Sequence, residues 1–409
     1  MDSRARVCSA LNHREPDRIP IDFSGHRSSG ISAIAYAQLR NYLGLEQRPV
    51  KVYDPVQQLA IVDEDILQFF SVDTVELGRA FAIDDEWWTD WVLPDGTPCL
   101  MPIWAKPVKS GDGWAIRSEG GRTIAHMPRG VLYFEQAYFP FAENDDLDRI
   151  AEAFSECMWT AVATPPGPIA AGEEGLTHLK EGARRLRSQS NRAILGLFGG
   201  NLLEIGQFFY RNDNFLMLLA GNPIRAHEFL DRILTIHLAN LERFLGAVGP
   251  YIDIVLFGDD LGMQRGPQVS PKMYREFLQP RERILWRRAK ELAPQVKVKL
   301  HCCGGVRPLL PGLIEAGLDA INPVQISCQG MNPAELKRDF GAELTFWGGG
   351  CDTQDVLSGG TPAQVRDHVL RLMDIWRPGG GYVFQQVHNI LAHVPPANIV
   401  AMFDAVKEA

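Results

Sequence analysis

Eight short apolar runs, each ending in glycine or polar residues, limit the possible folds of this chain more than any other feature. They cover residues 19–23, 72–77, 193–200, 252–260, 296–304, 319–325, 344–350 and 382–389. Helical patterns lie between most of them, and several begin with a Ser-Pro, Thr-Pro or Asn-Pro start signal. Strands that alternate with helices form a parallel sheet with helical crossovers. Eight such units predict a closed (β/α)8 (TIM) barrel, with a doubly wound open sheet as the alternative.

One segment, at about 84–141, breaks this alternation. It contains tryptophans, β-branched residues and the turn signals Pro-Asp-Gly, Gly-Asp-Gly and Gly-Gly, and it has little helical periodicity. That composition is typical of β-hairpins. We therefore predict one domain spanning residues 1–409, with an antiparallel β insertion after the second barrel strand. We expect the tryptophans to pack the insertion onto the barrel, and a lid over the barrel mouth is the alternative.

Composition and charge exclude several classes of protein. Hydrophobic residues make up 45% and charged residues 22% of the 409 residues, as in ordinary globular proteins. The net charge of −9 argues against nucleic-acid binding, and no apolar run approaches the roughly 18–20 residues that span a membrane. The N-terminus lacks the apolar core of a signal peptide, and seven thinly spread cysteines do not form a secreted disulfide framework. We expect a cytoplasmic protein that acts on a small molecule.

The predicted strand ends carry many polar residues. In a (β/α)8 barrel, catalytic groups lie at the C-terminal ends of the strands, where the loops converge. The residues that we expect to take part in catalysis are Asp22, Glu76, Asp259 and His388. Those that we expect to bind substrate are Arg27, Asp260, Gln264, Asn322 and Gln325. For each group the alternative is a structural role, as a helix cap, a loop brace or the partner of an arginine.

The fifth run, "VKVKLHCCG", ends in a histidine and two cysteines and suggests a metal site. Side chains alternate along a strand, so His301 and Cys303 point to one face and Cys302 to the other. Cys351 follows three glycines that allow a sharp turn, and we predict it as the third ligand. One imidazole and two thiolates suit zinc and leave a fourth position open. His388 and Cys328 are the alternative third ligands, and buried structural thiols are the alternative to a metal site.

Motifs along nearly the whole chain resemble the uroporphyrinogen decarboxylase superfamily, particularly its cobalamin-dependent methyltransferase branch. The matching stretches are "ALNHREPDRIPIDF", "FGDDLGMQRGPQVSPKMYREFLQPRERIL", "LHCCGGVRPLLPGLIEAGLDAINPVQ", "WGGGCDTQDVL" and "GGGYVFQQVHNILAHVPPANIVAMFDA". The resemblance implies a (β/α)8 barrel in which His-x-Cys and a later cysteine hold a catalytic zinc. His301 and Cys303 match the first part of that motif. The later cysteine of that branch lies near the final strand, where this chain has Val387 and His388, and Gln325 stands roughly where the branch has an acidic residue.

These observations favour a zinc-dependent methyltransferase that moves a methyl group between a thiol, ether or amine and a corrinoid (cobalamin). No D-x-H-x-x-G run occurs in the chain, so the corrinoid is expected on a separate carrier protein. Zinc lowers the pKa of a bound thiol or acts as a Lewis acid. One alternative is a metal-free decarboxylase-type carboxy-lyase that uses Asp22, Arg27 and Glu76, although only Arg27 remains where decarboxylases have an arginine-rich stretch. The other alternative is a non-catalytic protein that binds a corrinoid or its carrier.

Overall fold

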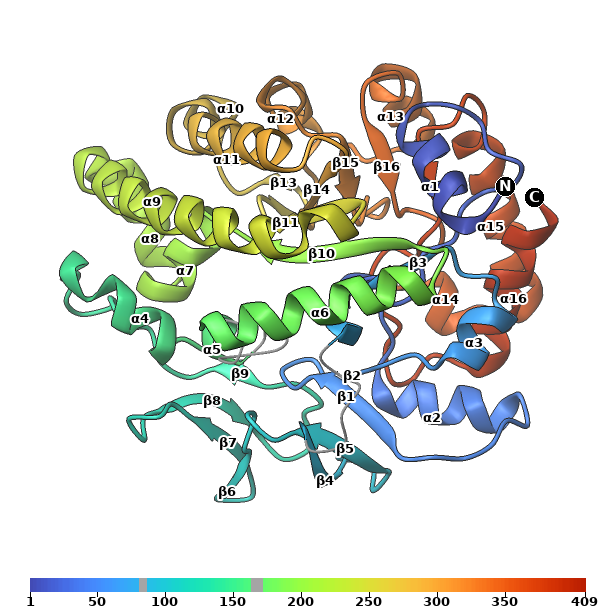
Figure 1. Cartoon of the computed structure of the whole chain (residues 1–409), viewed down its shortest axis with the longest axis horizontal. Helices are drawn as coiled ribbons and strands as arrows, with labels where there is room; N and C mark the ends of the chain where they lie inside the picture. The colour runs from blue at the N-terminus through green and yellow to red at the C-terminus, as the bar shows by residue number, and fades with distance from the viewer. Residues whose placement is uncertain (81–86, 163–171) are drawn as a thin grey trace.

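The computed structural model describes residues 1–80, 87–162 and 172–409, and its centre is a curved parallel sheet surrounded by helices (Figure 1). The sheet has seven strands in the order β17-β16-β15-β14-β11-β10-β3, and every neighbouring pair is parallel. The strands are β3 (Thr74–Glu76), β10 (Ala193–Gly199), β11 (Ile254–Gly258), β14 (Lys297–His301), β15 (Ala320–Asn322), β16 (Thr345–Trp347) and β17 (Tyr382–Val383). Each lies within one of the predicted apolar runs.

The first predicted run, residues 19–23, closes the sheet without forming a regular strand. Ile21 makes a parallel bridge to Phe384, just beyond β17, and the main-chain N–H of Asp22 donates to the Phe384 carbonyl at 2.8 Å. On its other side, the N–H of Asp73 donates to the Ile21 carbonyl at 2.8 Å, just before β3. The segment therefore joins the two ends of the sheet. The prediction of a (β/α)8 barrel is confirmed.

Helices fill the crossovers between the strands, and the predicted start signals form caps. The Oγ of Ser270 accepts from the N–H of Met273, and Thr361 and Gln364 form a reciprocal capping box. A π-helix (Tyr274–Leu278) separates α10 from α11. The helices are α1 (Ser3–Leu11), α2 (Ala33–Tyr42), α3 (Glu64–Phe69), α4 (Ile150–Glu156), α5 (Met158–Ala161), α6 (Glu173–Gln189), α7 (Leu203–Tyr210), α8 (Asn212–Gly221), α9 (Pro223–Val248), α10 (Pro271–Met273), α11 (Gln279–Leu292), α12 (Leu310–Ala316), α13 (Pro333–Phe340), α14 (Val356–Gly359), α15 (Pro362–Trp376) and α16 (Pro396–Glu408).

Helix α1 packs against the interior of the barrel at the N-terminal ends of the strands. Its apolar side chains share one buried cluster with inward-facing strand residues, and the cluster contains Val7, Ala10, Leu11, Ala193, Leu195, Ile254, Ala320, Trp347 and Val383. The helix is also held by an ion pair, because Nη1 of Arg6 lies 2.6 Å from Oδ1 of the fully buried Asp73. This end of the barrel is therefore filled with side chains.

The predicted insertion follows β3 and forms the lower left of Figure 1. Its strands are β4 (Trp88–Val92), β5 (Pro98–Pro102), β6 (Val108–Ser110), β7 (Gly113–Arg117), β8 (Thr123–Met127) and β9 (Glu135–Gln136). Strands β4 and β5 belong to one sheet, and β6, β7, β8 and β9 form a second sheet in that order. The predicted residues 84–86 lie outside the described part of the chain.

The insertion differs from the prediction in one respect, because two earlier strands join it. Strand β1 (Val50–Asp54) pairs parallel with β5, and β2 (Leu59–Ala60) pairs antiparallel with β1. A strand edge with unpaired main-chain groups needs a partner, and β1 supplies it to β5. The first sheet of the insertion is therefore mixed.

The tryptophans of the insertion have two roles. The rings of Trp91 in β4 and Trp114 in β7 lie 4.3 Å apart between centroids and join the two sheets. The ring of Trp87 meets His178 of the barrel helix α6, with 6.2 Å between centroids. The expected packing onto the barrel thus applies to Trp87, whereas Trp91 and Trp114 pack within the insertion. Among the described helices, none combines the length and the apolar character that crossing a membrane requires.

Candidate metal centre

Strand β14 carries the first two residues of the predicted metal site. His301 is the last residue of β14, and the Sγ of Cys303 lies 3.4 Å from its Nε2 atom. Cys302, between them, points the other way: its side chain is buried in the outer core, and its sulfur accepts from the N–H of Leu261 at 3.3 Å. The predicted alternation of side chains therefore holds to the end of the strand.

A sharp turn follows this pair of residues. Gly304 has φ +90°, and a Cβ atom on it would collide with the backbone of Gly262. Gly262 begins the short hairpin of β12 (Gly262–Met263) and β13 (Gly266–Pro267). A glycine is needed here because both the conformation and the close contact exclude a side chain. The turn places Cys303 at the C-terminal end of the barrel.

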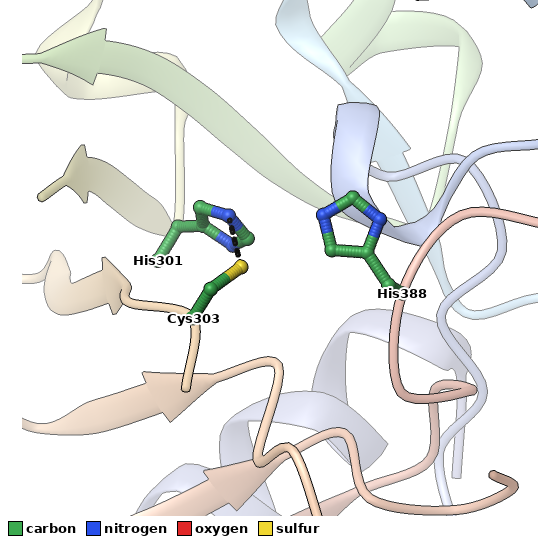
Figure 2. A group of neighbouring side chains, drawn as sticks. All are labelled: His301, Cys303 and His388. Carbon is green, nitrogen blue, oxygen red and sulfur yellow. Dashed lines mark hydrogen bonds between the residues drawn. The ribbon is translucent and has the colours of Figure 1, made fainter. Parts of the chain in front are cut away.

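His388, which follows β17, completes a group of three possible metal ligands with His301 and Cys303. One ligand atom from each residue lies within 4.8 Å of the other two. Figure 2 shows the imidazole of His388 facing the other two side chains across a short gap. In the described ranges of the chain, no other three histidine, cysteine or acidic side chains converge in this way.

Cys351, our predicted third ligand, is not in this group. Its side chain is fully buried in the outer core, and its thiol points to the carbonyl of Asp352 at 3.7 Å. The thiol lies near Tyr382, whose ring stacks on Trp376 of α15. The glycine turn therefore directs Cys351 toward the helices, and His388, the alternative third ligand, takes its place. Cys328, the other alternative, donates its thiol hydrogen to Gln264 at 3.3 Å and also lies outside the group.

Hydrogen bonds fix the tautomer of His388. The Nδ1 atom of His388 lies 2.8 Å from Oδ1 of Asn389, and Nδ2 of Asn389 donates to Oε1 of Gln57 at 2.9 Å. The Nε2 atom of Gln57 donates in turn to Oδ2 of Asp54 at 3.2 Å. A carboxylate only accepts, so it sets the orientation of both amides. The hydrogen of His388 therefore lies on Nδ1, and the lone pair of Nε2 is available to a metal.

The electrostatics of the group also suit a cation. Burial raises the pKa of the Cys303 thiol well above its ordinary value, and the negative charge of Asp260 raises it further. Burial lowers the pKa of His388 to about 4, and nearby His301 also lowers it, so the imidazole is neutral near pH 7. Neutral imidazoles and a thiolate are the ligands that zinc prefers, and a bound cation would stabilise the thiolate. The donor atoms therefore fit zinc.

Asp260 lies beside the group. Its Oδ1 atom accepts from the N–H of Cys303 at 2.7 Å and lies 3.7 Å from Nε2 of His301. Its side chain is 34% exposed, so the carboxylate is open to solvent and to a small molecule. Among the acidic residues that we predicted, Asp260 has the position of a group that contacts substrate.

Asp259, the neighbouring residue, has a structural position. Its carboxylate accepts from three successive main-chain N–H groups at the start of α7, those of Leu202, Leu203 and Glu204. Burial raises its pKa to about 7. A carboxylate at a helix N-terminus satisfies groups that have no partner within the helix. Asp259 thus fixes α7 to the end of β11, and the predicted catalytic role is not supported by its contacts.

The predicted residues from the first two barrel strands lie outside the metal group. Asp22 is fully buried, and its carboxylate accepts hydrogen bonds from Gly25, Ser29, Thr74 and Trp347. The Nε atom of Arg27 lies 3.3 Å from Oδ2 of Asp54. Glu76 is buried at the end of β3. These contacts give Asp22 a structural role.

Gln264 and Gln325 support the loops next to the group. The Oε1 atom of Gln325 accepts from the N–H of Gly304 at 3.0 Å, directly after Cys303. Gln264 accepts the thiol of Cys328, and its carbonyl accepts from the N–H of Gln329 at 2.9 Å. These contacts match the alternative role given above for Gln264 and Gln325, in which they brace loops and do not bind substrate.

Several residues near the group were not predicted from the sequence. Glu204, on α7, is half-buried, and burial together with Asp260 and Asp259 raises its pKa well above the ordinary value. Three further residues contact the hydrogen-bond partners of His301 and His388: Ser28 and Gln385 bond to Asn322, and Gln57 bonds to Asn389. Gln385 could have been found by strand alternation, because it lies two residues after the inward-facing Val383. The other three lie in loops or at a helix start, where no periodic pattern applies.

The fold and the site define the class: a (β/α)8 barrel with a group of side chains that could hold a metal ion at the C-terminal ends of its strands. The sequence of residues 165–409, more than half of the chain, matches the family Uroporphyrinogen decarboxylase (URO-D). The chain therefore belongs to the uroporphyrinogen decarboxylase (URO-D) family. No curated protein matches the sequence significantly.

Solved structures support the fold. A methyltransferase from Methanosarcina mazei superimposes with a TM-score of 0.59 at 14% sequence identity, and the match covers 100% of this chain and 99% of that chain. At this identity the likeness establishes the fold only. A xylanase 10B from Thermotoga maritima gives a TM-score of 0.36 at 11% identity, covering 66% of this chain and 93% of that chain, which carries no further information.

Proposed function

We propose that this protein is a zinc-dependent methyltransferase that moves a methyl group between a small thiol, ether or amine and a corrinoid on a separate carrier protein. The observation that carries the proposal is the convergence of His301, Cys303 and His388 within 4.8 Å. Membership of the URO-D family and the similar fold of a methyltransferase support it.

His301, His388 and Cys303 would hold the zinc, and three protein ligands leave a position for substrate. Zinc supplies a Lewis acid, which lowers the pKa of a thiol or polarises the methyl-bearing atom of an ether or amine. The protein's own contribution is to keep the imidazole of His388 neutral and to orient both rings through hydrogen bonds to their Nδ1 atoms. Asp260 holds the backbone of Cys303 in place and offers a partly exposed carboxylate to the substrate.

The metal-free carboxy-lyase is the weaker alternative. It requires Asp22, Arg27 and Glu76 to act on a substrate acid. Asp22, however, is fully buried and is the acceptor of hydrogen bonds from four neighbours. A metal-free carboxy-lyase would also give no role to the convergence of His301, Cys303 and His388.

Metal analysis of protein purified without chelators tests the proposal. We expect about one zinc per chain, since one set of donors converges, and we expect His301→Ala and Cys303→Ser to lose it. Methyl transfer is followed by the change in the visible spectrum of methylcobalamin when thiols are added, and of cobalamin in the cobalt(I) state when methyl ethers or amines are added. Absence of metal would contradict the proposal and favour the carboxy-lyase. Bound zinc without methyl transfer, even with a corrinoid carrier protein present, would favour a non-catalytic binding protein.

A further inference from the structure

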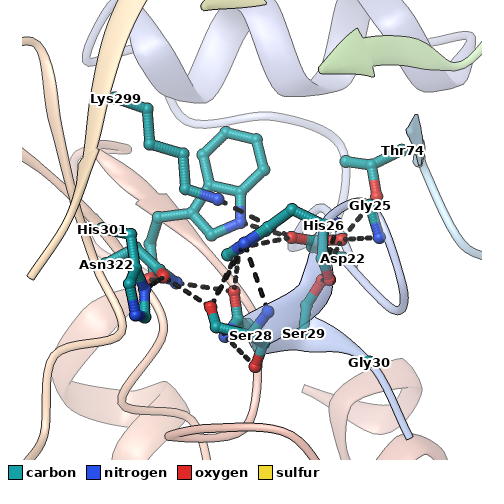
Figure 3. A network of polar contacts seen from close by, with 12 residues as sticks. Asp22, Gly25, His26, Ser28, Ser29, Gly30, Thr74, Lys299, His301 and Asn322 are labelled. Atoms are coloured by element: carbon teal, nitrogen blue, oxygen red, sulfur yellow. Dashed lines mark hydrogen bonds and ion pairs between the residues drawn. The ribbon is translucent and has the colours of Figure 1, made fainter. Parts of the chain in front are cut away.

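We propose that Asn322 is a positioning residue that holds His301 in the tautomer whose Nε2 atom can bind a metal. This inference rests on the proposed function, because it concerns a candidate zinc ligand. It replaces the substrate-binding role that the sequence predicted for Asn322. Figure 3 shows the hydrogen bonds that link Asn322 to His301, Ser28 and their neighbours.

The side chain of Asn322 is fully buried, and all of its hydrogen-bonding positions are used. Its Oδ1 atom lies 2.7 Å from both the Oγ of Ser28 and the Nδ1 of His301. Its Nδ2 atom donates to the main-chain carbonyl of Trp347 at 2.8 Å and to Oε1 of Gln385 at 2.7 Å. An amide has two donor hydrogens and one acceptor oxygen with two lone pairs. No polar atom of Asn322 remains for a substrate.

Main-chain carbonyls determine which way this amide points. A reversed Asn322 would place its oxygen 2.8 Å from the carbonyl oxygen of Trp347, and neither atom has a hydrogen to share. The amide of Gln385 is fixed in the same way, because its Nε2 atom donates to the carbonyl of Ser28 at 3.1 Å. The Oε1 atom of Gln385 therefore faces Asn322. Two independent carbonyls thus require the oxygen of Asn322 to face His301.

His26 agrees with this assignment. The main-chain N–H of Ser28 points to Nδ1 of His26 at 3.4 Å, so Nδ1 accepts. The hydrogen of the neutral ring then lies on Nε2, which is 3.3 Å from Oε1 of Gln385. The hydrogen on Nε2 of His26 therefore requires the oxygen of the Gln385 amide to face it. The Ser28 carbonyl, which accepts from Nε2 of Gln385, requires the same orientation of this amide. The hydrogen bonds of the whole network are therefore mutually consistent.

The tautomer of His301 follows directly. Its Nδ1 atom faces an oxygen at 2.7 Å and must carry the hydrogen. Its Nε2 atom then carries the lone pair, which faces the Sγ of Cys303 at 3.4 Å. Removal of such an acceptor typically lowers metal affinity about 10–100-fold, because the ring can then rotate or adopt the other tautomer. We expect a loss of this size for Asn322→Leu, which keeps the approximate volume of the side chain.

Histidine ring 15N NMR of the metal-free protein tests the tautomer directly and requires neither zinc nor activity. His301→Gln identifies the signals of His301. We expect the wild-type ring to carry its hydrogen on Nδ1, and we expect Asn322→Leu to shift the ring toward the other tautomer. A hydrogen on Nε2 in the wild type would overturn the inference, even if the variant did not fold.

Zinc affinity, measured by competition with a coloured chelator, gives the second readout. Ser28→Ala removes the other hydrogen bond to the same oxygen but leaves Asn322 in place, and it should lower the affinity less than Asn322→Leu does. Asn398→Leu is the control for stability, because Asn398 is also buried and donates to two main-chain carbonyls away from the site, those of Leu357 and Gly360. If the wild type binds zinc and Asn322→Leu binds it with the same affinity, the inference about Asn322 is overturned, while the proposed function stands. A wild type without zinc would overturn the proposed function, while the NMR result would still decide the tautomer.

Discussion

Replacing His388 by alanine should remove zinc from the protein, whereas replacing Cys351 by alanine should not. The sequence favoured Cys351 as the third ligand, but in the structure its thiol is fully buried and points to the carbonyl of Asp352. His388 belongs to the group with His301 and Cys303, and the hydrogen bond of its Nδ1 atom to Asn389 leaves the lone pair on its Nε2 atom. The two variants therefore separate the two assignments.

The size of the effect follows from the number of ligands. Zinc sites with four protein ligands bind with about 10–16 kcal/mol, so one ligand supplies about 3 kcal/mol, or about two powers of ten in affinity. We expect this loss in His388→Ala. Cys351→Ala replaces one buried sulfur atom and should cost about 1 kcal/mol of folding stability, with the zinc affinity unchanged.

Zinc content by mass spectrometry, and affinity by chelator competition, measure these differences. Thermal unfolding of both metal-free variants shows whether either change acts through stability. His388→Gln serves as the matched variant that keeps a polar side chain without the imidazole, and it should lose zinc as His388→Ala does. Full zinc in His388→Ala together with its loss in Cys351→Ala would refute the geometry described above.

Three further predictions concern the strand end, a buried acid and the closed end of the barrel. Cys303→Ser should weaken zinc binding far more than Cys302→Ser, and equal losses in chelator competition would contradict the alternation of side chains. Burial raises the pKa of Glu282 to about 8, above its ordinary 4.5, so ionisation favours unfolding and stability falls as the pH rises from about 4.5 to 8. The melting temperature of Glu282→Gln relative to that of the wild type should therefore rise between pH 5 and pH 9. A difference in melting temperature that does not change with pH would contradict the raised pKa of Glu282. Asp73→Ala leaves Arg6 and Arg18, which both form ion pairs with Asp73, without this buried partner. The change should cost about 3 kcal/mol in denaturant unfolding, and a loss below about 1 kcal/mol would show that solvent compensates for the lost ion pairs.

The barrel could be predicted because each strand is an apolar run of suitable length. The run at 19–23 was found in the same way, although it closes the sheet with only an isolated bridge to Phe384. Strands β1 and β2 were missed because their pairing is not local: β1 pairs with the edge that β5 offers, and β2 pairs with β1. That contact between distant segments leaves no local pattern in the sequence.

The metal group could be predicted only where strand alternation applies. His301 and Cys303 are separated by one residue at the end of β14, so their common face follows from the strand. Cys351 comes after Gly348 and Gly349, whose φ values of +128° and +62° change the chain direction and end any alternation. His388 lies five residues beyond the end of β17. The path of the loop after β17 therefore brings His388 close to His301 and Cys303, and strand alternation does not predict that path.

The side chains that fill the N-terminal end of the barrel have a consequence for kinetics. Helix α1 and the inward-facing strand residues occupy the barrel axis at the end opposite His301, Cys303 and His388, so a small molecule and the proposed carrier protein would both approach these residues from the C-terminal end of the barrel. In the proposed reaction, methyl donor and methyl acceptor then compete for one entrance. A compound that occupies this entrance should inhibit competitively against both reactants, and each reactant in excess should slow the entry of the other.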